Sequence, residues 1–254
     1  MTISPITAED LIAAFALPPG PPPRRVAKST LADFVPTASD KRLVDSKLAR
    51  LEWMAAINPD TTGISAAESG GLAIQTVNLL LARTRGALPP RLAEIIHRAI
   101  PQPVILVHSD EGTDASAGFS LAPKRAAERE AGRVVVTALH DTGALELGDE
   151  PFLATLALPR LPARDLAALY AGLVERVEAL AAARRRKRPF RLPTSEQELG
   201  RWRDAVLRCT ALEGEIAVLV SAMRKETRLA RRVEMGEVVR KLKASLDKCL
   251  SNLD

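Results

Sequence analysis

An apolar repeat in the C-terminal segment constrains the fold of this chain more than any other feature. Pro193 is the last proline, and beyond it apolar side chains recur in steps of three and four residues. This spacing places one apolar stripe along a helix, and such a stripe has to be buried against another surface. We therefore expect a long helical arm over residues 194–254, either coiled-coil-like or folded as a helical hairpin. The stripe consists of Trp202, Val206, Cys209, Leu212, Ile216, Leu219 and Met223, followed by Met235, Val239, Leu242, Leu246, Cys249 and Leu253.

The stripe changes phase between Val233 and Gly236, where glycine costs a helix about 1 kcal/mol relative to alanine. A kink, a stutter or a turn between two helices would each explain the change. We expect the arm to pair with a protein partner or with a second copy of the chain, unless it folds back on its own chain.

The rest of the chain reads as an α+β body. The pattern predicts a small mixed or antiparallel sheet of four to five strands, flanked by helices. Helices are expected over residues 8–17, 40–57, 91–99 and 164–183. Strands are expected over residues 74–81, 104–107, 118–122, 133–140 and 152–158.

The domain organisation follows from these elements and from the prolines. Thr7 is expected to cap the first helix with Asp10 in a capping box, and Pro18–Pro23 must be extended. The predicted segments are an N-terminal helix and proline-rich strap over 1–39, the body over 40–183, a basic linker over 184–193 and the arm over 194–254.

Positive charge is concentrated locally rather than spread over the chain. The net charge is +5, and one run contributes six positive charges without an acid: Arg184, Arg185, Arg186, Lys187, Arg188 and Arg191. A second basic group lies in the arm: Arg224, Lys225, Arg228, Arg231 and Arg232. These residues are candidates for salt-dependent contact with the phosphates of DNA or RNA. The alternative for the run is a solvated connector that pairs with acids of the arm such as Glu196 and Glu198.

Catalytic signatures are weak. His108 and Asp110 follow one predicted strand, and His140 and Asp141 follow another, so the four could form a metal or acid–base site at one sheet edge. The alternative is that strand ends simply turn, since turns favour Asp, Ser and Gly. The chain has no nucleophile elbow and no phosphate-binding loop, and the strand over 74–81 lacks the acid of a restriction-type nuclease. We expect no cofactor and no bound metal.

The predicted location is the cytoplasm. Glu9 and Asp10 interrupt the N-terminus, which has no basic run of a secretory signal, and no apolar run reaches the ~20 residues of a membrane span. Cys209 and Cys249 both fall on the apolar stripe, as expected of buried thiols in a reducing compartment.

Several short motifs occur along most of the chain in a characteristic order and spacing. They are Phe15-Ala16-Leu17-Pro18, Val26-Ala27-Lys28, Leu51-Glu52-Trp53-Met54, Asn58-Pro59, Arg98-Ala99-Ile100-Pro101, Val104-Ile105-Leu106-Val107, Leu212-Glu213-Gly214-Glu215-Ile216, Lys225-Glu226 and Val233-Glu234-Met235. In this order and spacing they resemble a bacterial family defined only as a domain of unknown function. The resemblance implies a cytoplasmic protein, often encoded beside helicase and DNA-methyltransferase genes of restriction or phage-defence islands, and it carries over no catalytic residues.

Together these patterns favour a non-catalytic interaction or scaffold subunit with electrostatic contact to nucleic acid, and the resemblance implies a bacterial DNA-processing or phage-defence complex as its setting. The alternative is a metal-dependent nuclease or hydrolase that uses His108, Asp110, His140 and Asp141.

Overall fold

The computed structural model describes residues 5–112, 117–127 and 133–251. The chain divides into two compact units, Met1–Val177 and Glu178–Asp254. We call them the N-terminal unit and the C-terminal unit. The helix α6 (Leu166–Arg186) contributes to both.

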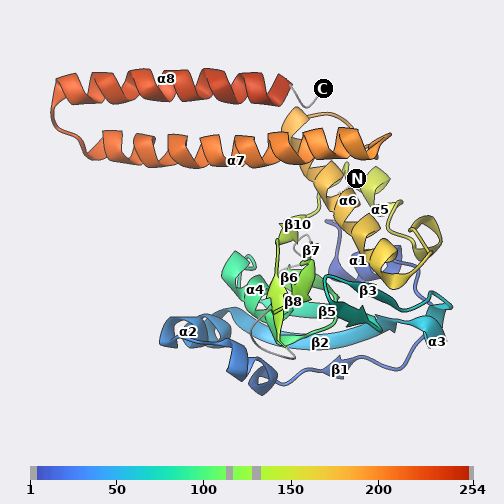
Figure 1. Ribbon diagram of the computed structural model, residues 1–254. Helices are drawn as coiled ribbons and strands as arrows, with labels where there is room; N and C mark the ends of the chain where they lie inside the picture. The colour runs from blue at the N-terminus through green and yellow to red at the C-terminus, as the bar shows by residue number, and fades with distance from the viewer. Residues whose placement is uncertain (1–4, 113–116, 128–132, 252–254) are drawn as a thin grey trace. The chain divides into compact units, whose positions relative to one another are not determined.

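The N-terminal unit is built around a mixed sheet of six strands, which confirms the α+β class (Figure 1). The strand order is β1-β2-β5-β6-β7-β10, and β5 and β6 are parallel whereas every other neighbouring pair is antiparallel. The sequence predicts four to five strands, and the sheet has more because it includes two short strands at its edges. The strands are β1 (Arg24–Arg25), β2 (Leu48–Ile57), β5 (Val77–Thr84), β6 (Val104–Asp110), β7 (Gly118–Leu121) and β10 (His140–Asp141).

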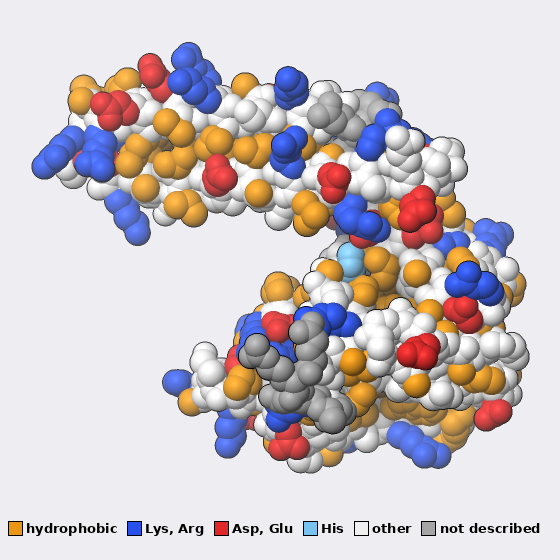
Figure 2. All heavy atoms as spheres, in the orientation of Figure 1, with side chains coloured by type: hydrophobic (Ala, Val, Ile, Leu, Met, Phe, Trp, Pro, Cys, Tyr) orange, Lys and Arg blue, Asp and Glu red, His pale blue; other side chains and the backbone are white. Residues whose placement is uncertain are grey.

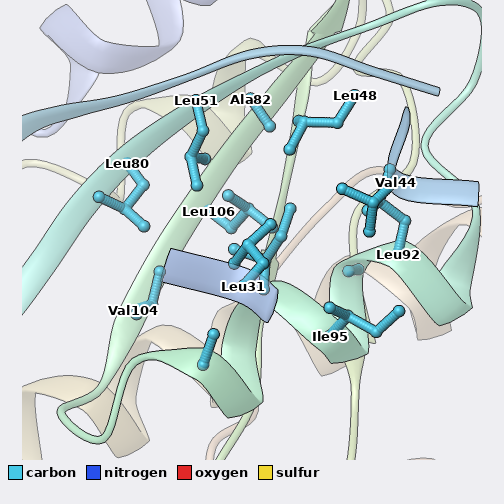
Figure 3. Packing of buried hydrophobic residues seen from close by; sticks show 13 residues of the cluster. Leu31, Val44, Leu48, Leu51, Leu80, Ala82, Leu92, Ile95, Val104 and Leu106 are labelled. Atoms are coloured by element: carbon cyan, nitrogen blue, oxygen red, sulfur yellow. The ribbon is translucent and has the colours of Figure 1, made fainter. Parts of the chain in front are cut away.

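One face of the sheet packs against helices and forms an aliphatic core (Figure 3). The covering elements are the 3₁₀ helix η1 (Lys28–Phe34), α2 (Ala38–Lys47) and α4 (Pro90–Ala99). Because neighbouring strand residues point to opposite faces, Leu80 and Ala82 of β5 reach this core together with Val104 and Leu106 of β6. The helix α4 is also the crossover that a parallel pair such as β5 and β6 requires.

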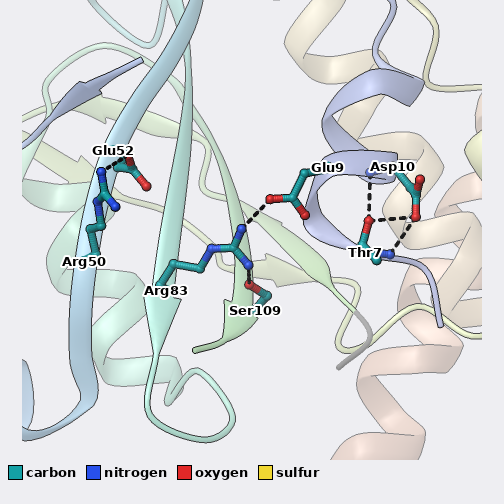
Figure 4. Close-up of polar contacts among 7 residues, drawn as sticks. All are labelled: Thr7, Glu9, Asp10, Arg50, Glu52, Arg83 and Ser109. Atoms are coloured by element: carbon teal, nitrogen blue, oxygen red, sulfur yellow. Dashed lines mark hydrogen bonds and ion pairs between the residues drawn. The ribbon is translucent and has the colours of Figure 1, made fainter. Parts of the chain in front are cut away.

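The opposite face carries a cluster of three phenylalanines. Phe119 contacts Phe15 edge to face, with ring centroids 5.6 Å apart, and it stacks on Phe152 at 6.0 Å. Arg83 on this side joins Glu9 of α1 (Ala8–Ala14) to the hydroxyl of Ser109 (Figure 4). Aromatic packing and this ion pair fix α1 against the sheet.

The predicted capping box is confirmed. Thr7 accepts a hydrogen bond from the backbone N–H of Asp10, and the Asp10 carboxylate accepts from Thr7 in return (Figure 4). The helix ends at Ala14 rather than at residue 17, because the chain enters the left-handed region at Ala16, with φ 48°.

Three sequence-based assignments in the body are wrong. The helix predicted over 40–57 is α2 followed by β2, because residues 48–57 pair with β5. The strand predicted over 152–158 is replaced by α5 (Glu150–Leu153) and the 3₁₀ helix η2 (Leu158–Arg160). The strand predicted over 133–140 divides, since β9 (Val134–Val136) pairs with β8 (Lys124–Ala126) in a separate ribbon.

Three further elements complete the N-terminal unit. Asn58 caps the short helix α3 (Pro59–Thr62). The strands β3 (Ala67–Ser69) and β4 (Leu72–Ile74) form a hairpin, so the strand predicted over 74–81 is the end of β4 followed by most of β5.

The C-terminal unit consists of the last turns of α6 and a helical hairpin of α7 (Glu196–Lys225) and α8 (Leu229–Ser251). Figure 1 shows α7 and α8 side by side along most of their length. The turn comprises residues 226–228, not the predicted region near Gly236. Gly236 lies inside α8, and a Cβ on it would be 4.0 Å from the sulfur of Met223 on α7.

The apolar stripe of the sequence is the seam of this hairpin. Its members from Trp202 to Cys249 are buried or half-buried, whereas Leu253 lies outside the described residues. In the part of the chain that the structure describes, no helix is long and apolar enough to cross a membrane.

Candidate functional surfaces of the C-terminal unit

The base of the hairpin is its best packed part. Trp202 and Cys209 of α7 pack with Ala179 and Ala182 of α6 and with Cys249 of α8. Beyond Cys209, α7 has no further fully buried residue. The hairpin therefore has a stable base, and its distal half is held mainly by half-buried seam contacts.

The basic run of the sequence lies at this base, and part of it has a structural role. Arg186 and Arg191 both lie over the indole ring of Trp202, at 4.5 and 4.6 Å from its centroid. Cation–π contacts of this kind stabilise a partly desolvated guanidinium. The guanidinium of Arg185 contacts Glu213, with 2.6 Å between Nη1 and Oε1, and donates to the hydroxyl of Thr210.

Glu198 anchors the connector between α6 and α7. One of its carboxylate oxygens accepts from Arg191 at 2.6 Å, and the other accepts from the backbone and hydroxyl of Thr194. Arg191 first, and Thr194 second, lower the pKa of Glu198 to about 2. The connector thus pairs with the arm through Glu198. This is the arrangement expected if the basic run serves as a connector that pairs with acids of the arm.

The other members of the run are exposed. Arg184 belongs to the last turn of α6, and Lys187 leaves that helix in the left-handed region, with φ 52°. Arg184, Lys187 and Arg188 present their side chains to solvent.

The second basic group lies at the turn of the hairpin, which we call the tip. Its five side chains are exposed, and within the described residues Arg231 makes their one ion pair, with Glu226 at 3.8 Å. Figure 2 shows Lys and Arg side chains gathered at this end of the hairpin. The tip comprises Arg224, Lys225, Arg228, Arg231 and Arg232.

The helix α8 adds basic residues that the sequence reasoning missed. Arg240, Lys241, Lys243 and Lys248 are exposed, and they follow the tip along α8 towards the base. About 27 residues of α7 separate the tip from Glu198, which is roughly 40 Å of helix. The basic run and the tip are therefore at opposite ends of the hairpin, with the cations of α8 between them.

Apolar side chains also reach the surface of the hairpin. Figure 2 shows them along much of its length on the face that the view presents. Leu207 is 64% exposed and Val218 is 70% exposed on α7, whereas Leu229, Val233 and Val238 are the exposed large apolar residues of α8. Exposed apolar residues repeated along a helix are typical of a docking surface.

The residues of the alternative enzymatic site are brought together only in part. His108 Nε2 lies 3.2 Å from Asp141 Oδ1. His140 is the other residue of β10, and it is half-buried in register with Leu121 of β7. Among the described residues, no group of three or more His, Cys, Asp or Glu side chains is arranged to hold a metal ion.

The carboxylate of Asp110 serves the turn after β6. It accepts a hydrogen bond from the backbone N–H of Gly112. Hydrogen bonds from the backbone of Gly86, Gly112 and Glu111 lower the pKa of Asp110. Asp110 thus stabilises a turn, as expected if the polar residues at the strand ends serve turns and not a catalytic site.

A second histidine, His97, forms a hydrogen-bonded pair with a serine inside the N-terminal unit. His97 Nε2 is 3.0 Å from the hydroxyl of Ser120, and both side chains are fully buried. Burial is the main cause that lowers the pKa of His97 to about 3, and Lys124 and His108 add to it. This pair resembles a hydroxyl nucleophile with its base, but a substrate has no access to a fully buried hydroxyl.

Comparison with known proteins places the chain in a family without assigning an activity. No curated protein and no solved structure shows a significant match. A family model described as Domain of unknown function (DUF4391) matches residues 20–246, which include the sheet, α6, α7 and most of α8. The chain belongs to this DUF4391 family.

Proposed function

We propose that this protein is a non-catalytic interaction subunit of a bacterial DNA-processing or phage-defence complex, and that its helical hairpin contacts nucleic acid. The observation that carries the proposal is the exposed tip, where five basic side chains lie together and, among the described residues, only Arg231 forms an ion pair, with Glu226. Long basic side chains at the end of a helical hairpin can reach phosphates at that end. Such contact is independent of sequence and weakens steeply with salt.

The base of the hairpin contributes less to the proposed contact with nucleic acid than the tip does, because several of its arginines bind other residues of the C-terminal unit. Arg185, Arg186 and Arg191 are engaged with Glu213, Trp202 and Glu198. On exposure alone we assign a second contact region to the end of α6, where Arg184, Lys187 and Arg188 reach the surface. Aromatics are 3% of the chain, and Trp202 is buried, so stacking on single-stranded bases is not part of the proposal.

The scaffold part of the proposal rests on the same hairpin. A two-helix hairpin buries one side of each helix, and this one leaves large apolar residues exposed on both helices. Surfaces of this kind are usually covered in an assembly. The family resemblance suggests helicase and DNA-methyltransferase subunits as the setting.

A salt titration of DNA binding tests the nucleic-acid contact. The test variant combines Arg224→Gln, Arg228→Gln and Arg232→Gln at the tip. The matched control combines Arg24→Gln, Arg25→Gln and Lys41→Gln, which removes the same charge from exposed positions of the N-terminal unit. We expect the test variant to bind duplex DNA more weakly, with the slope of log K against log salt reduced by about 0.9 for each phosphate that the tip no longer neutralises.

The outcome that contradicts the contact is equally clear. Equal loss of affinity in both variants would mean that net charge alone acts, and no binding by the wild type at low salt would remove the contact altogether. Purification from native cells tests the assembly separately, because recovery of the chain without any DNA-processing subunit contradicts the scaffold role.

A further inference from the structure

The side of α7 that faces away from the seam carries a second apolar stripe. It consists of Leu207, Ala211, Gly214 and Val218, which recur in steps of four, three and four residues; we call it the outer face. Leu207 and Ile216 are nine residues apart, which is half a turn out of phase on a helix, so the outer face and the seam lie on different sides. All four residues of the outer face are exposed.

Gly214 is not explained by packing within the chain. Glycine inside a helix costs about 1 kcal/mol relative to alanine. A Cβ added to Gly214 would meet no described atom within 4 Å, whereas a Cβ on Gly236 would approach Met223 of the facing helix. The space that Gly214 leaves at an exposed helix surface would allow another helix to approach closely.

The charged residues beside the outer face are arranged so that an antiparallel copy of the same helix would place bases opposite acids. Arg208 and Glu215 are seven residues apart on one edge of the face, and both are exposed. Asp204, Ala211, Val218 and Lys225 form a line in steps of seven residues, with an acid at one end and a base at the other. None of these four charged side chains forms an ion pair with another described residue.

We infer that the outer face of α7 binds a second copy of this chain, with the two α7 helices antiparallel. In this arrangement Leu207 packs against Val218 of the second copy, and Ala211 faces Gly214 at the crossing point. Arg208 then lies near Glu215 of the second copy, and Asp204 near its Lys225. A parallel two-fold pair would place this charged edge of the two helices on opposite sides of the contact, so only the antiparallel arrangement brings Arg208 close to Glu215 of the second copy.

This inference does not depend on the proposed contact with nucleic acid, because no tip residue belongs to the outer face and only Lys225 takes part in the pairing of charges beside it. The two-fold symmetry of such a pair is the commonest in protein oligomers. It leaves one tip at each end of the paired helices.

A charge-exchange experiment tests the inference. Sedimentation velocity measures the dimer dissociation constant of the full chain, its Arg208→Glu variant and the double variant Arg208→Glu with Glu215→Arg. We expect Arg208→Glu to weaken dimerisation roughly tenfold or more, because it sets acid against acid twice. The double variant exchanges the two charges and is expected to restore wild-type dimerisation.

Two further variants separate this surface from others. Lys243→Glu makes the same change of charge on an exposed position of α8 and should leave dimerisation unchanged. Gly214→Leu should weaken dimerisation while the helix content of the monomer is kept, because leucine is a good helix former. A wild-type chain that is monomeric at every concentration, or a double variant as weak as Arg208→Glu, would overturn the inference.

Discussion

The imidazole of His108 on β6 reaches the carboxylate of Asp141 on β10, with 3.2 Å between Nε2 and Oδ1, although β7 lies between the two strands. The residue of β7 in register with His108 is Gly118. Because Gly118 has no side chain, the imidazole has room to pass over β7. A Cβ at this position would overlap the carbonyl oxygen of Gly143 and would lie 2.9 Å from His108 Cε1.

The first prediction is that Gly118→Ala destabilises the N-terminal unit by about 3 kcal/mol, the upper part of the usual range for overpacking, because the clash is with backbone. Urea unfolding followed by the fluorescence of Trp53 measures this. Trp202→Phe in the background leaves Trp53 as the one tryptophan. Gly20→Ala is the control, since its added Cβ meets nothing within 4 Å. Equal unfolding midpoints for the two alanine variants would contradict the prediction.

The second prediction concerns acid stability and His97. Burial holds the pKa of His97 at about 3 in the folded chain, against 6.5 for an ordinary histidine. Between these values the unfolded chain binds a proton that the folded chain does not, so stability falls as the pH decreases. One such group contributes about 1.4 kcal/mol per pH unit.

The variant His97→Gln removes this titration while an amide remains beside Ser120. We expect it to be less stable than wild type at neutral pH, because the core is disturbed. Its free energy of unfolding should nevertheless fall less steeply below about pH 6.5. Urea unfolding at a series of pH values measures both slopes, and parallel curves for the two proteins would show that His97 is not the group responsible.

How far the sequence predicts this fold is illustrated by residues 40–57. The apolar positions Val44, Leu48 and Leu51 fit one side of a helix, yet the helix ends at Lys47 and β2 follows. The deciding contacts are with β5, which begins twenty residues after β2 ends. Short apolar segments fit both periods, and only the sheet partner distinguishes them.

The seam of the arm was predictable because it depends on local periodicity, but the contacts of its charges were not. The basic run is visible in the sequence as six cations. Its ion pairs with Glu213 and Glu198 and its contacts with Trp202 depend on how α6, the connector and α7 pack. The turn at residues 226–228 was also missed, because Gly236 is the more conspicuous helix breaker and serves instead as a contact point with α7.

The third prediction separates structural from nucleic-acid-binding arginines. Arg191→Gln should lower the unfolding midpoint of the C-terminal unit, because Glu198 loses its main partner and Trp202 loses one cation. The pKa of Glu198 should rise from about 2 towards its ordinary value of 4.5, so the variant lacks at neutral pH the stability that the wild type loses as the pH falls from about 4.5 towards 2, and the two proteins should become more alike at low pH. Affinity for DNA should change less than twofold.

Arg228→Gln at the tip should behave in the opposite way, with unchanged stability and a several-fold loss of affinity at low salt. Thermal unfolding and fluorescence anisotropy on duplex DNA measure the two properties for each variant. A larger loss of affinity for Arg191→Gln than for Arg228→Gln would move the contact from the tip to the base.

The fourth prediction uses Cys209 and Cys249, two buried free thiols on facing helices. Burial raises the pKa of Cys209 to about 11, and the Cys249 thiol donates to the carbonyl of Ala205 at 3.3 Å. At pH 8 the thiolate fraction of Cys209 is then roughly a hundredfold below that of an ordinary cysteine, and burial blocks the reagent as well. Both thiols should therefore react with a maleimide only when the hairpin opens at its base.

A Ser245→Cys variant supplies the comparison, since it adds an exposed thiol to the same helix as Cys249. We expect this thiol to react at the rate of a free cysteine, at least a hundredfold faster than the two native thiols, and all three to react equally in urea. Weakening the base with Glu178→Gln, which removes a carboxylate bound to Arg203 at 2.8 Å, should speed the reaction of the native thiols. Fast labelling of the native thiols in the folded wild type would show instead that α7 and α8 separate readily at the base.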